Sequence, residues 1–153
     1  MTQRLNPFAA APGPIKAWID YATTSAESGL EPSLMELVKI RASQLNGCAI
    51  CLHMHTGEAR RHGETEERIY LLDAWRESPL YSKRERAALG WTEALTLLAQ
   101  SHAPDDAYEA LKAEFTDEEQ VRLSLLIVVI NGFNRLSIGF RATHPMPAGR
   151  QAA

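Results

Sequence analysis

Cysteine is scarce in this chain of 153 residues, which contains only Cys48 and Cys51. A disulfide between residues so close in sequence closes almost no loop, so it would add little to the stability of the fold. The sequence therefore argues against a small domain held together by structural disulfides. In a reducing compartment, a close cysteine pair is more often catalytic or metal-binding.

Long hydrophobic runs and an excess of positive charge are also missing. The strongest apolar stretch, Leu123 to Ile130, is too short to span a bilayer. The N-terminal segment MTQRLNPFAAAPGP lacks the apolar core of a signal peptide. The formal net charge is −3, with both signs scattered along the chain, which disfavours a phosphate-binding surface. We expect a cytoplasmic protein that binds neither membranes nor nucleic acid.

Strand-like alternation, internal repeats and low-complexity segments are absent, whereas signals for helices recur along the whole chain. The length and the 45% hydrophobic content fit a single domain with a sizeable core. We predict a compact all-α fold of about seven helices, formed by one domain over residues 1–153. Residues 1–13 and 144–153 are expected to be extended tails.

Prolines, glycines and capping residues mark the ends of the predicted helices. Two capping boxes stand out, Ser82 with Glu85 and Thr116 with Glu119. These signals predict helices at residues 14–28, 32–46, 48–63 and 65–78, one of about twenty residues from 82, a short one from 104, and a last one from 116. The apolar block of the last helix is expected to lie in the core or in a subunit interface.

Three reactive side chains share one face of the third predicted helix. At about 100° per residue, Cys48, Cys51 and His55 fall within roughly 60° of one another. Cys51 and His55 are four residues apart and are therefore neighbours on the helix. Cys48 and Cys51 are close enough for a disulfide if the first turn is slightly irregular. His53 points to nearly the opposite side of this helix, and we expect it to lie outside the site.

Glu36 is the carboxylate expected behind His55. It lies on the preceding helix, and an antiparallel return after Asn46-Gly47 would bring it back beside the imidazole. By helical rise alone, Glu36 stands about 15 Å before the turn and His55 about 12 Å after it. A carboxylate in this position fixes the tautomer of the imidazole and raises its basicity.

This arrangement suits the reduction of a peroxide. The attacking species is a thiolate, and a free cysteine with a pKa of about 8.5 is mostly protonated at neutral pH. An imidazole supported by a carboxylate can accept the proton. The start of a helix favours the thiolate of Cys48, whereas the nearness of His55 favours Cys51. We favour Cys51 as the attacking thiol and Cys48 as the thiol that forms the disulfide.

A zinc site is the main alternative for these residues. Cys48, Cys51 and His55 supply three ligands, and Glu36 could supply a fourth. Three ligands on one continuous helix make a poor tetrahedron, because structural zinc cysteines usually lie on knuckles or loops. We therefore expect neither a metal nor another cofactor. Two buried cysteines that merely happen to be close are a second alternative.

The pattern E-x11-C-x2-C-x3-H resembles the alkylhydroperoxidase D / carboxymuconolactone decarboxylase superfamily, and in particular its peroxidase-related branch. Glu36, Cys48, Cys51 and His55 match it at every spacing. The likeness extends through ETEERIYLLDAWRESPLYSKRERAALGWTEALTLL to NGFNR, and covers the chain from about Arg4 to Arg141.

The resemblance implies a compact helical fold that assembles into homotrimers or hexamers. It also implies a peroxidase cycle in which Cys51 is the peroxidatic thiol, Cys48 is the resolving thiol, and His55 and Glu36 form a proton relay. The expected partners are a hydroperoxide and a thiol reductant, such as a lipoyl-bearing or thioredoxin-like protein. Some family peroxidases have a further histidine between the cysteines, where this chain has Ala49 and Ile50.

We therefore expect an alkylhydroperoxidase or peroxiredoxin-type oxidoreductase that reduces organic hydroperoxides. The alternatives are a dithiol adaptor that passes disulfides between proteins, and a decarboxylase-like member with other chemistry. Both cysteines are present, which argues against the decarboxylase branch. Asn131, Asn134 and Arg135 are expected to cap the end of the last helix or to line the thiol pocket. Trp75 and Trp91 are expected to pack in the core.

Overall fold

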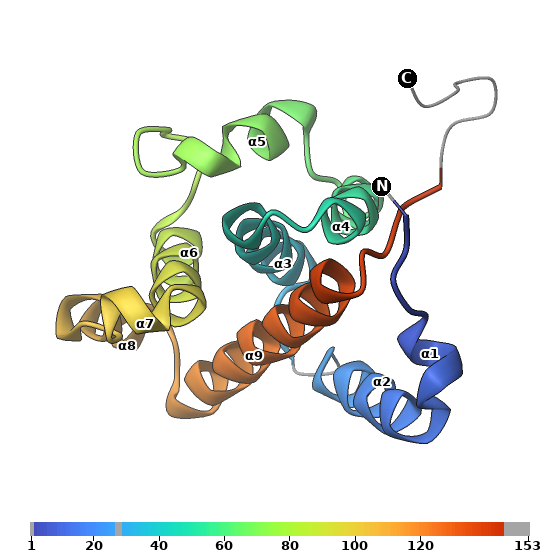
Figure 1. Ribbon diagram of the computed structural model, residues 1–153. Coiled ribbons are helices and arrows are strands. Elements are labelled where there is room, and N and C mark those ends of the chain that lie inside the picture. The colour runs from blue at the N-terminus through green and yellow to red at the C-terminus, as the bar shows by residue number, and fades with distance from the viewer. Residues whose placement is uncertain (1, 27–28, 146–153) are drawn as a thin grey trace.

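The computed structural model describes residues 2–26 and 29–145, and this part of the chain forms helices and no strands (Figure 1). The all-α prediction is confirmed. The elements are α1 (Pro7–Ala10), α2 (Pro12–Ala26), α3 (Pro32–Asn46), α4 (Ala49–Arg61), α5 (Glu66–Leu71), the 3-10 turn η1 (Leu72–Ala74), α6 (Lys83–Thr96), α7 (Leu98–Ser101), α8 (Asp105–Glu114) and α9 (Asp117–Gly139).

The cap signals place most helix ends correctly. Both capping boxes form, so Ser82 begins α6 and Thr116 begins α9. Pro32 is the first residue of α3, where its missing N–H costs nothing, and Gly47 ends that helix with a φ of 71°. Each of these ends is set by local chemistry, which explains why the sequence alone locates them.

Two predicted helices are interrupted, so the described residues contain more helices than the expected seven. The helix from residue 82 ends at Thr96, and α7 follows after Leu97. Ser101 Oγ donates to Ala94 O at 2.6 Å across this break, and so takes up a carbonyl at the end of α6. The helix predicted for 65–78 ends at Leu71 and tightens into η1. No single residue type marks either break.

The N-terminal tail is shorter than predicted. Asn6 Oδ1 accepts hydrogen bonds from the backbone of Phe8 and Ala9, which caps α1 where an extended segment was expected over 1–13. The next helix, α2, begins at Pro12 and not at Pro14. Most of the other predicted tail, residues 146–153 of 144–153, lies outside the described residues.

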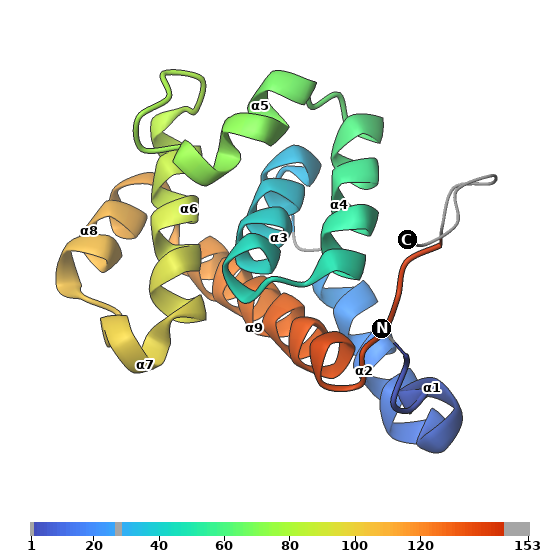
Figure 2. The ribbon, with the colours of Figure 1, turned by 45° about the horizontal axis from the view of Figure 1, so that its top comes forward.

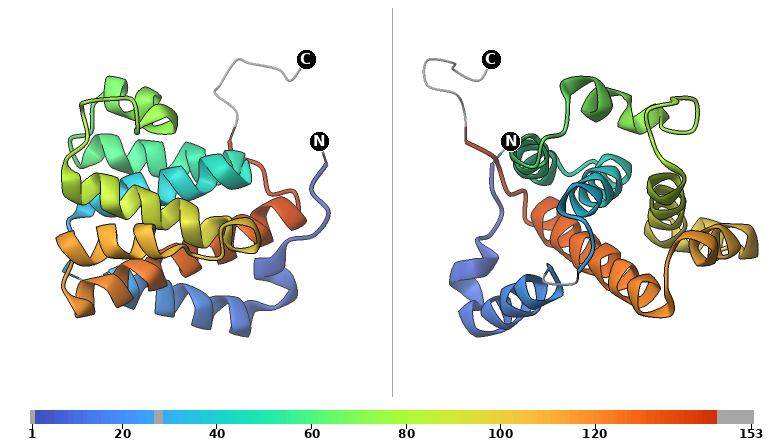
Figure 3. Two further views of the ribbon diagram at one scale, coloured as in Figure 1. Left: turned by 90° about the vertical axis from the view of Figure 1, so that its left-hand side faces the viewer. Right: turned by 180° about the vertical axis from the view of Figure 1, so that it is seen from behind.

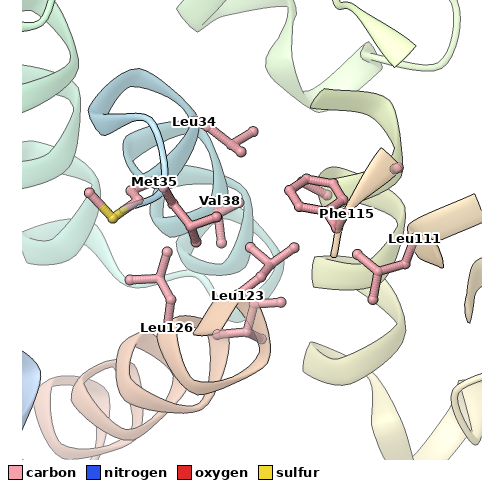
Figure 4. Packing of buried hydrophobic residues seen from close by; sticks show 11 residues of the cluster. Leu34, Met35, Val38, Leu111, Phe115, Leu123 and Leu126 are labelled. Atoms are coloured by element: carbon pink, nitrogen blue, oxygen red, sulfur yellow. The ribbon is translucent and has the colours of Figure 1, made fainter. Parts of the chain in front are cut away.

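Helices α3 and α9 lie at the centre of the molecule. α3 packs against α4, α6 and α9, and Figure 2 shows α4 and α6 on its two sides. Seen from the side, these helices and α8 run roughly alongside one another (Figure 3). Leu34 and Val38 of α3, Leu123 and Leu126 of α9 and Phe115 meet in the main core cluster (Figure 4). Burying each such side chain contributes about 1.5–3 kcal/mol.

Helix α9 has one face in the core and one face at the surface. Leu123 and Ile127 are fully buried, whereas Val121, Leu125 and Val128 are exposed. Within the described segments, α9 is the one helix long and apolar enough to cross a membrane by length and composition, a test that the core helix of a globular protein also passes. The sequence argument considered only Leu123 to Ile130, which is shorter than the helix.

Candidate functional site

A tight reversal of the chain between α3 and α4 positions the two cysteines. Gly47 adopts the left-handed conformation that a residue with a side chain rarely takes, and Cys48 N donates to Ser43 O at 3.0 Å. Cys48 is thereby placed at the N-cap of α4, and Cys51 is the third residue of that helix. The electrostatics of the helix start therefore act on both sulfurs and do not separate them.

Cys48 and Cys51 are joined by a disulfide, with their Cα atoms 5.4 Å apart. The expected proximity of the pair is therefore present. Cys48 is 1% exposed and Cys51 is 5% exposed, and they pack with Ala42 and Ile130. Access to these sulfurs is thus limited to small or slender reactants, with Cys51 the more accessible of the two.

His55 and Glu36 lie together across the α3–α4 pair, as their heights along the two helices predicted. His55 Nδ1 and Glu36 Oε2 are 2.9 Å apart, and both side chains are largely buried. Because a carboxylate only accepts hydrogen bonds, Nδ1 carries the proton and Nε2 is left as the basic nitrogen. Nε2 is the atom that can take a proton from a thiol.

A lysine that sequence reasoning missed completes this group. Lys39 Nζ lies 2.7 Å from Glu36 Oε1, so each oxygen of the carboxylate has its own donor. Burial by itself would raise the pKa of Glu36, but the hydrogen bonds from His55 and Lys39 outweigh it and hold this pKa below its ordinary value. The spacing of three residues on one helix was the signal that could have found Lys39.

A cavity of about 310 Å³ opens beside His55 and Lys39. Helices α2, α3, α4 and α9 contribute its walls, which are otherwise mostly apolar: Ile19, Ala22, Thr23, Leu126, Val129, Ile130 and Phe133. Ile130 also packs against the cysteine pair. Its volume and lining suit a small organic molecule. A larger groove of about 650 Å³, between α6 and α8, contains none of the four predicted site residues.

Asn131 and Asn134 do not cap a helix end, because α9 continues to Gly139, and neither residue lines the cavity beside His55. Both are buried, and Asn46 Nδ2 donates to their Oδ1 atoms at 3.0 and 2.9 Å. Asn134 Nδ2 in turn donates to Ser43 Oγ at 3.1 Å. For these two asparagines both alternatives from the sequence were wrong, and their amides instead fix the end of α3 just before Cys48.

Trp75, Trp91 and His53 do not line the cavity beside His55. Trp75 is buried, as predicted, and Trp91 is partly buried against the core. His53 stacks on His144 at 4.8 Å between ring centroids. Among residues 2–26 and 29–145, no three histidine, cysteine, aspartate or glutamate side chains are grouped so that they could hold a metal ion.

Comparison with known proteins identifies the family to which this arrangement belongs. The family model described as the carboxymuconolactone decarboxylase family matches residues 12–94, which include Glu36, both cysteines and His55. The chain belongs to the carboxymuconolactone decarboxylase family. The superfamily assignment made from the E-x11-C-x2-C-x3-H pattern is thereby confirmed.

Two curated relatives match most of the chain. The uncharacterized protein YdfG of Bacillus subtilis is 43% identical over 90% of this chain and 94% of its own length. The uncharacterized protein YnjA of Escherichia coli is 32% identical over 79% of this chain and 64% of its own length. A shorter match of 41 residues, 44% identical, is to the alkyl hydroperoxide reductase AhpD of Hyphomonas neptunium.

Solved structures share the fold. A protein of unknown function from Agrobacterium tumefaciens, suggested to be the antioxidant defence protein AhpD, has a TM-score of 0.93 and 45% identity over 95% of this chain and all of its own. The debrominase Bmp8 has a TM-score of 0.80 at 17% identity over 89% of this chain and 73% of its own, and at this identity it shows the fold alone. The family fold therefore carries more than one chemistry.

Proposed function

We propose that this protein is a thiol-dependent peroxidase that reduces organic hydroperoxides through Cys51 and Cys48. The observation that carries the proposal is the hydrogen bond between His55 Nδ1 and Glu36 Oε2 at 2.9 Å, one helical turn from Cys51. A base oriented in this way beside a cysteine pair is what thiolate chemistry needs. The family membership agrees with this assignment.

The first step oxidises Cys51. Its thiol gives its proton to Nε2 of His55, and the thiolate attacks the terminal oxygen of the hydroperoxide. The S–O bond forms as the O–O bond breaks, and the departing alkoxide takes the proton back from His55. The products are a sulfenic acid on Cys51 and an alcohol.

The second step returns the site to the disulfide form. The thiol of Cys48 attacks the sulfenic sulfur of Cys51, which releases water and forms the Cys48–Cys51 bond. An external dithiol then reduces this disulfide and is itself oxidised. The disulfide observed between these residues corresponds to the end of this half-cycle.

The cavity beside His55 supports an organic substrate and a slender reductant. Its walls are mostly apolar and its volume is about 310 Å³, enough for the body of a small alkyl or aryl hydroperoxide. The burial of both cysteines favours a peroxidase over a dithiol adaptor, because an adaptor must present its disulfide to another protein. A lipoyl arm is thin enough to reach such a site, and a lipoyl-bearing protein is the reductant that we propose.

The apolar residues on the outer face of α9 support assembly of several chains. Val121, Leu125 and Val128 are spaced by four and three residues, so they lie on one face, and all three are exposed. We propose a cytoplasmic homo-oligomer, a trimer or a hexamer, that buries this face. Light scattering would show a multiple of the chain mass, and Val128→Asp would reduce that mass.

A variant that cannot form the disulfide tests the chemistry. Reduced Cys48→Ser is treated with cumene hydroperoxide and a sulfenic-acid reagent, and the adduct is located by mass spectrometry. The proposal predicts a label on Cys51, and no label in the double variant that also contains Cys51→Ser. If Cys51 stays unlabelled while the wild-type protein exchanges disulfides with protein partners, the adaptor function replaces the peroxidase function.

A further inference from the structure

Lys39 connects the proton relay to the cavity. Its ammonium donates to Glu36 Oε1, the other oxygen of that carboxylate faces His55 Nδ1, and Lys39 and His55 both line the cavity. The side chain of Lys39 is 17% exposed and that of Glu36 is 7% exposed. This ion pair is therefore shielded from solvent, unlike the surface pairs that contribute little.

We propose, on the basis of the peroxidase function above, that Lys39 is a positioning residue of the thiol site. It holds Glu36 as a carboxylate whose Oε2 accepts from His55 Nδ1, and it thereby keeps Nδ1 protonated and Nε2 available as the base. The relay in this chain is then Lys39, Glu36, His55 and Cys51. Lys39 acts through Glu36 and transfers no proton itself.

The physical argument rests on the two oxygens of Glu36. With Lys39 in place, one oxygen accepts from the ammonium and the other accepts from His55, so the buried charge is paired on both sides. Without Lys39, burial favours the neutral carboxylic acid, because one of the two hydrogen-bond partners that compensate for desolvation is gone. A neutral Glu36 can donate a hydrogen bond through its O–H to an unprotonated Nδ1, so the ring proton moves to Nε2 and the base that the thiol step needs is lost.

The other charged groups around Glu36 cannot replace Lys39. Glu58 and Arg61 of α4 act on Glu36 only at a distance, and they are paired with each other through two hydrogen bonds at the surface. The cavity-lining residues from α2 and α9 are not ionisable. Among the described residues, Lys39 is the lysine or arginine whose hydrogen bond reaches this carboxylate.

The test compares Lys39→Met with Lys39→Arg and with a matched control. Lys112 forms the same type of ion pair, three residues from Glu109 on α8, at 3.0 Å and with both side chains exposed. Lys112→Met therefore removes an ion pair of the same residue types and spacing at the surface of α8, and controls for the loss of a lysine charge. Thermal unfolding is recorded for all variants, and Lys39→Gln takes the place of Lys39→Met if the latter does not fold.

The first readout is the rate at which the reduced protein loses thiols with cumene hydroperoxide, as a function of pH. Lys39→Met is expected to be about tenfold slower or more, a smaller loss than that of the base itself, because Lys39 acts through Glu36. The acid limb of its pH profile moves to higher pH, since Glu36 becomes protonated earlier. Lys39→Arg restores both the rate and the profile, and Lys112→Met leaves both unchanged.

The second readout does not depend on any peroxide. Nitrogen NMR of the His55 ring reports which nitrogen carries the proton, and the proposal predicts a change from the Nδ1–H form in wild type to a mixture in Lys39→Met. If this variant keeps the wild-type tautomer, rate and pH profile, Lys39 only forms a structural ion pair with Glu36 and the inference is wrong. If wild-type protein consumes no peroxide but the tautomer still depends on Lys39, the inference stands and only the peroxidase function fails.

Discussion

Two carboxylates lie on opposite sides of α3 and are used differently. Glu36 faces α4 and contacts Lys39 and the imidazole of His55. Glu93 of α6 accepts from Arg41 Nε and Trp75 Nε1, each at 2.8 Å, and from Arg76 at 2.5 Å. In both cases burial raises the pKa of the carboxyl and the hydrogen bonds more than reverse it, so both pKa values lie below the ordinary value.

The partners of the two carboxylates decide their roles. Guanidinium and indole groups neither gain nor lose a proton near neutral pH. The group around Glu93 can therefore only hold η1 and α6 against α3. An imidazole can accept and return a proton in that range, so the group around Glu36 can take part in proton transfer. A lowered pKa therefore does not identify a reactive site unless one of the partners is itself able to titrate.

The largest expected effect is on stability, at Glu93. Glu93→Ala leaves the buried Arg41 with Asp73 and Gln44 as its remaining partners, and we expect a loss of about 3 kcal/mol in the free energy of unfolding. Urea unfolding measures this loss. The rate of thiol oxidation per folded molecule should stay at the wild-type level, and a parallel fall in that rate would contradict the division between the two regions.

The second effect is on rate, at Glu36. Glu36→Gln keeps the shape of the side chain but removes the charge that fixes His55, and we expect thiol oxidation to slow by about 10²-fold. This corresponds to about 2.7 kcal/mol in activation free energy, at about 1.36 kcal/mol for each factor of ten. Stopped-flow measurement of thiol loss gives the rate, and an unchanged rate would remove Glu36 from the mechanism.

A third, smaller effect is expected at the turn that carries Cys48. Asn46→Ala leaves the buried Oδ1 of Asn134 without its donor, whereas Asn131 Oδ1 still accepts from Arg135 Nη1, and we expect a loss of about 1–2 kcal/mol in the free energy of unfolding. Closure of the Cys48–Cys51 disulfide should slow more than the attack by Cys51, because the turn precedes Cys48 directly. Trapping of the Cys51 sulfenic acid in this variant measures the delay.

The smallest effect is the dependence of stability on pH. Because the folded-state pKa values of Glu36 and Glu93 are lowered, each carboxylate stabilises the fold above its unfolded pKa, and this contribution disappears as the pH falls through the folded value. Glu36→Gln and Glu93→Gln should therefore differ from wild type most at neutral pH and least in acid. A difference that grows in acid would reverse the assigned sign.

The contacts that sequence reasoning found are those fixed by one helix or one turn. The stripe of Cys48, Cys51 and His55 follows from helical spacing, and the contact with Glu36 follows from the similar distances of Glu36 and His55 from the turn at Gly47. Lys39 could have been found in the same way, because it lies one turn from Glu36.

The contacts that it missed join elements far apart along the chain. Asn46 reaches Asn131 across 85 residues, and Arg41 reaches Glu93 across 52. These contacts depend on how α9 and α6 are placed against α3, which no local pattern in one sequence reports. The break at Leu97 is also missed, because neither glycine nor proline marks it. It is stabilised instead by the hydrogen bond from Ser101 Oγ to Ala94 O.

The central claim, that Glu36 and His55 serve the oxidation of Cys51 by a peroxide, is tested most directly by counting thiols in a single turnover. The protein is fully reduced, separated from the reductant and mixed with one equivalent of cumene hydroperoxide. The account predicts fast loss of both thiols for each peroxide consumed, abolished by Cys51→Ser and slowed by His55→Ala and Glu36→Gln. Thiols that stay reduced for many minutes in the wild-type protein would contradict it.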